Sequence, residues 1–240
     1  MHADTTAEFA RRLCPHRGIG KENTLAAISS SIEIKPFFVE FDVQWDGKDL
    51  CLGHPPLIEK GTYLSDALNL FVNTVTIPKI DLKLLNPNYG PAMESLINQL
   101  LKWSPRKAIV NISIVSGISV ELTAQQFMVA ETLLVHLTNQ NVLLNIDLQR
   151  YLGKSRKEVR DHLQNLDRKP YSISPNLDDN INETISFAKE QRIKTLQFWS
   201  HSHGRHKLSY LYEIIDLCNV SGLEAYFDIR PENIIHDIHT

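Results

Sequence analysis

Residues 9–43 read FARRLCPHRGIGKENTLAAISSSIEIKPFFVEFDV and contain one complete strand–loop–helix–strand unit. The segment Phe37–Val43 has strand character because aromatic and β-branched residues fill a stretch of strand length. Asn23–Ile34 carries apolar residues at helical spacing. Phe9–Cys14 is a weaker strand, placed by its position before this helix and not by its own composition. A strand followed by a helix and a second strand indicates a βαβ unit with parallel strands.

The same alternation continues to the end of the chain. Further strands are expected at Thr76–Leu82, Lys107–Ile114, Asn141–Leu148, Tyr171–Ser174, Lys194–Trp199 and Leu223–Ile229. Helices are expected at Ser65–Phe71 (capped by Ser65), Pro91–Trp103, Thr123–Leu137, after the capping box Ser155–Glu158, at Asn182–Glu190 and at Leu208–Asn219. Eight such units in 240 residues predict an α/β fold, a single (β/α)8 TIM barrel domain spanning residues 1–240. An open doubly wound sheet is the alternative, but it needs a GxGxxG turn after the first strand, and residues 15–20 read PHRGIG.

Composition narrows the class of protein further. The chain is 42% hydrophobic and 22% charged, as in globular proteins, and its net charge of −3 gives no global attraction to nucleic acid or to an anionic membrane. A small local anion site remains compatible with this balance. No apolar run approaches the ~20 residues of a membrane span. The three cysteines, Cys14, Cys51 and Cys218, match neither a disulfide framework nor a metal motif. We therefore expect a cytoplasmic protein without nucleic-acid partners.

Acidic and basic residues gather where the predicted strands end, which is where barrel enzymes place their sites. Glu40 and Asp42 share one face of a strand because side chains alternate with a period of two. With Asp81 they offer three hard oxygen ligands, which suit one divalent cation, Mg²⁺ or Ca²⁺, and not Zn²⁺. Arg17 and Lys83 suit the oxygens of a substrate phosphate. The alternative is that the two basic residues form ion pairs with these carboxylates.

The motifs along this part of the chain resemble the signature of the glycerophosphodiester phosphodiesterase family, whose fold is a phospholipase-C-like (β/α)8 barrel. They are His16-Arg17-Gly18, Glu22-Asn23-Thr24, Glu40-x-Asp42-Val43, Asp46-Gly47, His54 and Asp81-Leu82-Lys83. The dense match covers residues 15–83, and fainter similarity extends to Phe198–Ser200 and Phe227–Glu232. The resemblance implies a metal-dependent phosphodiester hydrolase acting on a small-molecule substrate.

The resemblance also implies roles for individual residues. His16 and His54 correspond to the family's general acid–base pair, and a neighbouring substrate hydroxyl is expected to attack phosphorus first, giving a cyclic phosphate. Glu22 is a further ligand or orients Arg17, while Asn23 is expected to cap the first helix. The pocket or its surroundings are expected to include Asn111, Asp147 and Trp199. The segment His201–His206 is expected to be a solvated loop.

The chain also departs from the family pattern. Pro55 follows His54 where the family has Asp, and Asp81 stands where Glu is usual. His54 and Asp81 are separated by 26 residues, too few for the family's insertion subdomain, so a more open pocket is expected. Two alternatives stay open. One is a phospholipid-headgroup phosphodiesterase of the sphingomyelinase D type, and the other is a non-catalytic barrel that binds a phosphate ligand.

Overall fold

A curled nine-stranded sheet forms the centre of the molecule in a computed structural model that describes residues 9–55, 61–84, 89–104, 106–114, 141–147, 161, 169–200 and 204–235. Its strands are β1 (Leu13–Pro15), β2 (Phe38–Trp45), β3 (Leu50–Leu52), β4 (Ile77–Leu84), β5 (Ala108–Ile114), β6 (Val142–Asp147), β7 (Ser172–Ser174), β8 (Thr195–Trp199) and β10 (Glu224–Ile229). Their order in the sheet is β1-β10-β8-β7-β6-β5-β4-β2-β3. Consecutive parallel strands therefore lie side by side, as the βαβ units predict.

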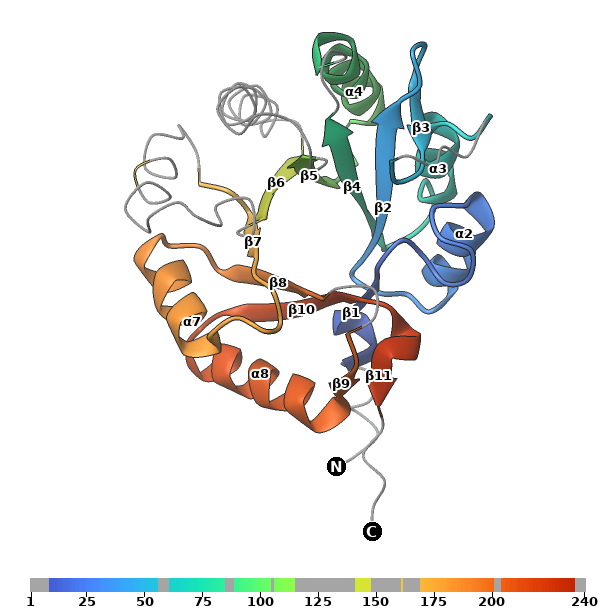
Figure 1. Cartoon of the computed structure of the whole chain (residues 1–240). Helices are drawn as coiled ribbons and strands as arrows, with labels where there is room; N and C mark the ends of the chain where they lie inside the picture. Colours follow the sequence, from blue (N-terminus) through green and yellow to red (C-terminus); the bar gives the residue numbers. More distant parts are fainter. Residues whose placement is uncertain are drawn as a thin grey trace.

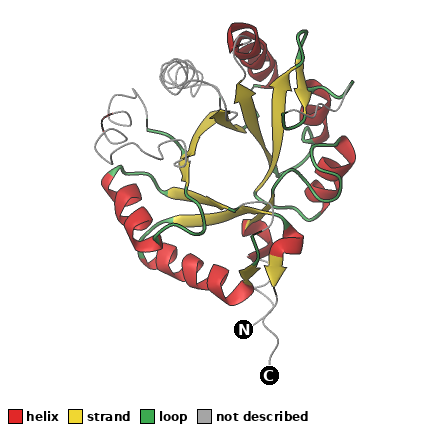
Figure 2. Ribbon diagram, in the orientation of Figure 1, coloured by secondary structure: helices red, strands yellow, loops and turns green. Residues whose placement is uncertain are grey.

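The sheet curls around a central axis, and the described helices cover its outside (Figure 1). All neighbouring strands pair in parallel except β3, which returns from β2 as an antiparallel hairpin. The edges meet next to β1 and β2, where the Phe37 N–H donates to the Arg11 carbonyl oxygen at 2.8 Å. The predicted α/β barrel is confirmed, and its strands and helices alternate around the ring (Figure 2).

The helices on the outside begin and end close to the predicted positions. They are α2 (Leu25–Glu33), α3 (Leu64–Leu70), α4 (Tyr89–Trp103), α7 (Ile181–Glu190) and α8 (Leu208–Val220). A short 3-10 helix, η3 (Pro231–Asn233), and a two-stranded parallel sheet of β9 (His206–Lys207) and β11 (Ile234–Ile235) lie beyond the strand ends. None of the described helices combines the length and the apolar character that crossing a bilayer would require.

Three local predictions were wrong. Residues 9–12 are helical, so the first strand is Leu13–Pro15 and not Phe9–Cys14. Thr24 caps α2 by accepting from the Ala27 N–H, which leaves the amide of Asn23 free to bond elsewhere. Helix α3 starts at Leu64, before Ser65, because the Asp66 carboxylate accepts from the Tyr63 N–H and fixes the first turn one residue earlier.

The interior of the barrel has two layers of different chemistry. At the end where the strands begin, a small apolar cluster forms a plug around Cys14, Phe38 and Ile109, with Tyr226 packed against it. Above the plug, the inward side chains of β2, β4, β6 and β8 are polar and buried. The main hydrophobic core lies between the outer face of the sheet and the helices. The polar layer lies toward the end where the strands finish, and this layer holds the candidate site.

Some predictions lie outside the described residues. They are the helix Thr123–Leu137, the capping box Ser155–Glu158 and the start of the loop His201–His206. That residues 1–240 form a single domain stays a prediction.

Candidate functional site

Three buried carboxylates meet inside the barrel. The period of two along β2 points Glu40 and Asp42 inward, and the parallel register pairs Asp42 with Asp81 of β4. One oxygen of each of the three carboxylates lies within 4.8 Å of the others. The side chains of Glu40, Asp42 and Asp81 are between 0% and 10% exposed. The structure thus brings together the three residues that the sequence selected as cation ligands.

Two basic side chains lie against this carboxylate cluster. The Lys83 Nζ is 2.7 Å from Asp81 Oδ2 and 2.9 Å from Asp42 Oδ1. The Arg17 Nε is 2.8 Å from Asp42 Oδ2. Burial lowers the pKa of Lys83, but the charges of Asp81 and Asp42 outweigh burial and raise that pKa well above its usual value. The ion pairs that the sequence left open as an alternative are therefore present in this structure.

The cluster also has features that fit a hard divalent cation. Glu40 Oε1 is buried and has no hydrogen-bond partner, so it is an acceptor without a donor. Burial raises the pKa of Glu40, His16 opposes this increase and the charges of Asp42 and Asp228 add to it, and the resulting pKa is about 8. All three cluster members are carboxylates, the ligands that Mg²⁺ and Ca²⁺ prefer. A cation at this position would satisfy Glu40 Oε1 and lower the repulsion among the acids.

His16 is held on the other side of Glu40. Its Nδ1 is 3.1 Å from Asp228 Oδ1 and 3.2 Å from Glu40 Oε2. Burial lowers the pKa of His16, but Glu40 and Asp228 outweigh burial and raise that pKa to about 9. Asp228 also forms a buried ion pair with Lys79. One oxygen or nitrogen each of His16, Glu40 and Asp228 lies within 4.8 Å of the others, which makes this a second cluster of potential ligands.

Sequence reasoning missed the roles of Asp228 and Lys79, although both follow from strand periodicity. Asp228 lies near the end of β10. Its neighbours Phe227 and Ile229 point outward into the core between sheet and helices, so Asp228 points inward. Lys79 lies two residues before Asp81 on the same face of β4. A search for charged residues at even spacing along the whole of every strand would have selected both residues.

The backbone of the loop after β1 contacts the site directly. The Arg17 N–H donates to Glu40 Oε2 at 2.9 Å, and Arg17 adopts a φ of 58°. Gly18 has a φ of +82°, and a Cβ there would lie 2.8 Å from the backbone carbon of Ala27. Only glycine fits between this turn and helix α2. The Asn23 amide donates to Asp42 Oδ2 at 2.9 Å, so Asn23 positions a carboxylate instead of capping a helix.

Glu22 bridges two arginines at the rim. Its Oε2 accepts from Arg17 Nη1 at 3.1 Å and its Oε1 accepts from Arg230 Nη1 at 2.6 Å. Arg230 also pairs with Glu232 at 2.6 Å. Of the two roles expected for Glu22, the structure shows contact with Arg17. Arg230 is a rim residue to which the sequence reasoning had assigned no role.

His54 lies at the end of the hairpin. It follows β3, and the N–H of its neighbour Gly53 donates to the Asp42 carbonyl oxygen at 3.0 Å, which ties the loop to β2. The His54 Nδ1 lies 2.8 Å from the carbonyl oxygen of Pro55, so this nitrogen is engaged by its own loop. The backbone of the turn at Pro55 therefore holds one edge of the imidazole ring.

The wall opposite the carboxylates is made of neutral polar side chains. Asn145 donates to Asn111 Oδ1 at 3.3 Å and to Ser174 Oγ at 2.8 Å, and it accepts from Ser172 Oγ at 2.6 Å. Asn111 is buried in the interior and accepts this hydrogen bond within the wall. Trp199 ends β8 and is partly exposed. The side chain of Asp147 lies outside the described part of the structure.

The loop after β8 was expected to be solvated, but its last residue, His206, is not. His206 is buried and its Nε2 lies 2.7 Å from Ser200 Oγ. Burial lowers the pKa of His206. Cys14 and Cys51 are buried, and burial raises the pKa of both thiols, so both pack as small hydrophobic residues.

Comparisons with known proteins identify the fold. No protein-family model and no curated protein matches the sequence of this chain. Among solved structures, the chain is similar to a phosphodiesterase from Oleispira antarctica, whose structure contains the product sn-glycerol-3-phosphate. The similarity covers 90% of this chain and 92% of that chain, with a TM-score of 0.63 and 14% sequence identity. At this identity, the similarity shows a shared α/β barrel fold.

Proposed function

We propose that this protein is a metal-dependent phosphodiester hydrolase acting on small glycerophosphodiester-like substrates. The observation that carries the proposal is the meeting of three buried carboxylates with Lys83, Arg17 and His16 where the strands end. Burying this many charges in a barrel interior costs free energy, and the apolar residues that usually fill the interior would avoid that cost. The shared fold with a phosphodiesterase supports the same class of reaction.

The residues divide the work by their chemistry. Glu40, Asp42 and Asp81 would hold the divalent cation, Mg²⁺ or Ca²⁺, which when bound polarises a phosphoryl oxygen. Arg17 and Lys83 neutralise the phosphate oxygens, the first as a planar fork and the second as a point charge. His16 and His54 are the groups that take a proton from the attacking hydroxyl and give one to the leaving oxygen. Because Nδ1 of each ring is already engaged, Nε2 is the nitrogen of each that exchanges protons.

The test is turnover by the purified full chain. Glycerophosphodiesters, lysophospholipids and a chromogenic bis-aryl phosphate are supplied with Mg²⁺, with Ca²⁺ or with chelator. Chelator-sensitive turnover that is lost in Glu40→Gln and His16→Ala, but retained in the surface control Glu213→Gln, supports the proposal. Preference for a lysophospholipid with a choline headgroup would indicate the sphingomyelinase D type. Equal turnover with and without chelator would contradict the metal dependence.

A non-catalytic barrel that binds a phosphate ligand is the second candidate. The observation that favours it is that both predicted phosphate ligands, Arg17 and Lys83, already pair with carboxylates. In this case a phosphate ester would bind and raise the melting temperature without being cleaved. Calorimetric titration with sn-glycerol-3-phosphate, followed by product analysis, separates the two candidates.

A further inference from the structure

Among the described residues, the end of the barrel opposite the candidate site carries more basic than acidic side chains. All strands except β3 run in parallel, so the segments that lead into them lie at one end, which we call the basal face. The described residues of these segments are 9–12, 34–37, 71–76, 104, 106–107, 141, 169–171, 191–194 and 221–223. They contain eight Lys and Arg residues, and three exposed acids, Glu33, Glu190 and Glu224, directly adjoin them. The chain as a whole has a net charge of −3, so this distribution is a local concentration.

The opposite end shows no such bias in its described residues. The turn at residues 46–49 reads DGKD, and Glu22 and Glu232 lie among the arginines of the rim. Lysine and arginine at helix C-termini are favoured by the helix dipole, which accounts for residues such as Lys35 and Arg192 individually. Arg11 and Arg12 end the helical stretch at residues 9–12, so the dipole favours them as well, but it does not account for the exposed apolar residues on this face.

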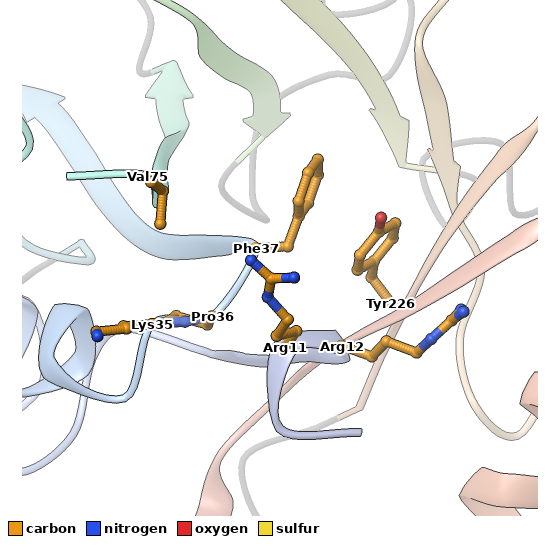
Figure 3. A pocket seen from close by; sticks show the side chains of 7 residues that line it. All are labelled: Arg11, Arg12, Lys35, Pro36, Phe37, Val75 and Tyr226. Atoms are coloured by element: carbon orange, nitrogen blue, oxygen red, sulfur yellow. The ribbon is translucent and has the colours of Figure 1, made fainter. Parts of the chain in front are cut away.

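A pocket of about 410 Å³ opens in the basal face. Its base is formed by Phe37 and Tyr226, whose rings stack at 4.5 Å between centroids. Figure 3 labels the lining side chains, which include Arg11 and Arg12 from the segment before β1, the rings of Phe37 and Tyr226, and Val75. Within the described part of the chain, no ion-pair partner is found for Arg11 or Lys35. The pocket therefore presents positive charge to a ligand over an aromatic floor.

Exposed apolar side chains lie in the wall of this pocket and beside other segments of the basal face. Val75 is 75% exposed and lies in its wall, and Ile34, 42% exposed, precedes Lys35. Val220 is 84% exposed at the end of α8, directly before the segment that enters β10. An exposed valine makes no favourable contact with a free anion or with the phosphate backbone of a nucleic acid. Basic residues together with protruding apolar residues are instead the combination that binds the interface of an anionic bilayer.

From these observations we infer that the basal face is a peripheral docking surface for anionic lipid bilayers. Arg11, Arg12 and Lys35 attract the headgroup phosphates, the pocket receives one of them, and Val75 and Val220 enter the headgroup region. Docked in this way, the protein presents the candidate site to the aqueous phase. If the proposed function holds, its substrates are then water-soluble phosphodiesters and not lipids of the membrane to which it binds.

The test is sedimentation of the full chain with vesicles, which measures binding and is independent of turnover. One set of vesicles is phosphatidylcholine, and the other contains about 30% phosphatidylglycerol. We expect binding to the anionic vesicles that weakens with salt, and weak binding to neutral ones. Arg11→Gln with Lys35→Gln should reduce the partition coefficient at least about tenfold. Val75→Ser with Val220→Ser, which changes no charge, should reduce it about threefold to tenfold.

The matched control removes two charges from the other end of the barrel. Lys48→Gln with Arg205→Gln changes the net charge by the same amount and should leave vesicle binding unchanged. An equal loss in this control would show a response to net charge alone and would overturn the inference. Equal binding to neutral vesicles, or no binding to either set, would also overturn it. Tighter binding of single-stranded RNA, insensitive to the valine substitutions, would identify a different partner and contradict the proposal.

Discussion

Replacing Glu40 with Gln tests whether the carboxylate cluster is a cation site. The substitution keeps the shape of the side chain and keeps an oxygen to accept from the Arg17 N–H, but it removes the charge and one ligand oxygen. Glu40 belongs to both potential ligand clusters of the described structure, so the variant disables either arrangement. It also removes the buried oxygen that lacks a hydrogen-bond partner. We therefore expect cation binding to be lost while the fold is kept.

The size of the effect follows from linkage. A cation present at about 100 times its dissociation constant stabilises the folded state by about 2.7 kcal/mol. With an unfolding entropy of about 2.1 cal/mol/K per residue, 240 residues give about 0.5 kcal/mol/K. The wild-type melting temperature should therefore rise by about 5 °C in saturating Mg²⁺ or Ca²⁺ relative to chelator. The Glu40→Gln variant should show no rise.

The assay is thermal unfolding followed by circular dichroism, with and without chelator. The control is Glu213→Gln, which removes the same charge from the exposed surface of α8 and should keep the full shift. A full shift in Glu40→Gln would place the cation elsewhere in the protein. The absence of any shift in the wild type at millimolar Mg²⁺ and Ca²⁺ would refute the reasoning from the donor set.

Three further predictions rest on the same contacts. In chelator, the free energy of unfolding should decrease as pH rises from about 4.5 to about 9, because the folded-state pKa values of Glu40 (about 8) and His16 (about 9) lie above their unfolded values. Denaturant titrations at several pH values in this range measure this decrease. The free energy of unfolding should fall less steeply with pH in Glu40→Gln. Asp228→Asn should destabilise the fold by about 3 kcal/mol because it leaves Lys79 buried without its ion-pair partner. The same variant should lower kcat, because Asp228 also orients His16. Adding Lys79→Met should restore the stability but not the kcat. Gly18→Ala should cost about 1–3 kcal/mol in chemical denaturation, since its Cβ would meet Ala27, whereas Gly20→Ala meets nothing within 4 Å and should cost less.

The alternation of strands and helices was sufficient to predict the barrel, because each element has its own local signal. The strand period of two likewise predicted that Glu40 and Asp42 face the same way. What the sequence could not show was the partner of each charge, since partners such as Asp228 and Lys79 are separated by 149 residues. The sequence also did not show which of two adjacent residues caps α2. Thr24 and Asn23 are both good helix caps, and the position of Asp42 in space decides between them.

The pairing of charges inside the barrel has a consequence for ligand binding. Lys83 contacts Asp42 and Asp81, so the ammonium stands against two of the carboxylates that a cation would use. A cation that binds these carboxylates releases the charge of Lys83, which then needs another anion because it is buried. A substrate phosphate provides that anion. The phosphate pairs with the buried charge of Lys83 that the cation releases, and the cation pairs with the carboxylates that Lys83 then leaves. The arrangement therefore predicts that cation and phosphate bind more tightly together than either does alone. Since the outer core between sheet and helices carries the apolar burial, the interior is able to hold this exchangeable set of charges without loss of the fold.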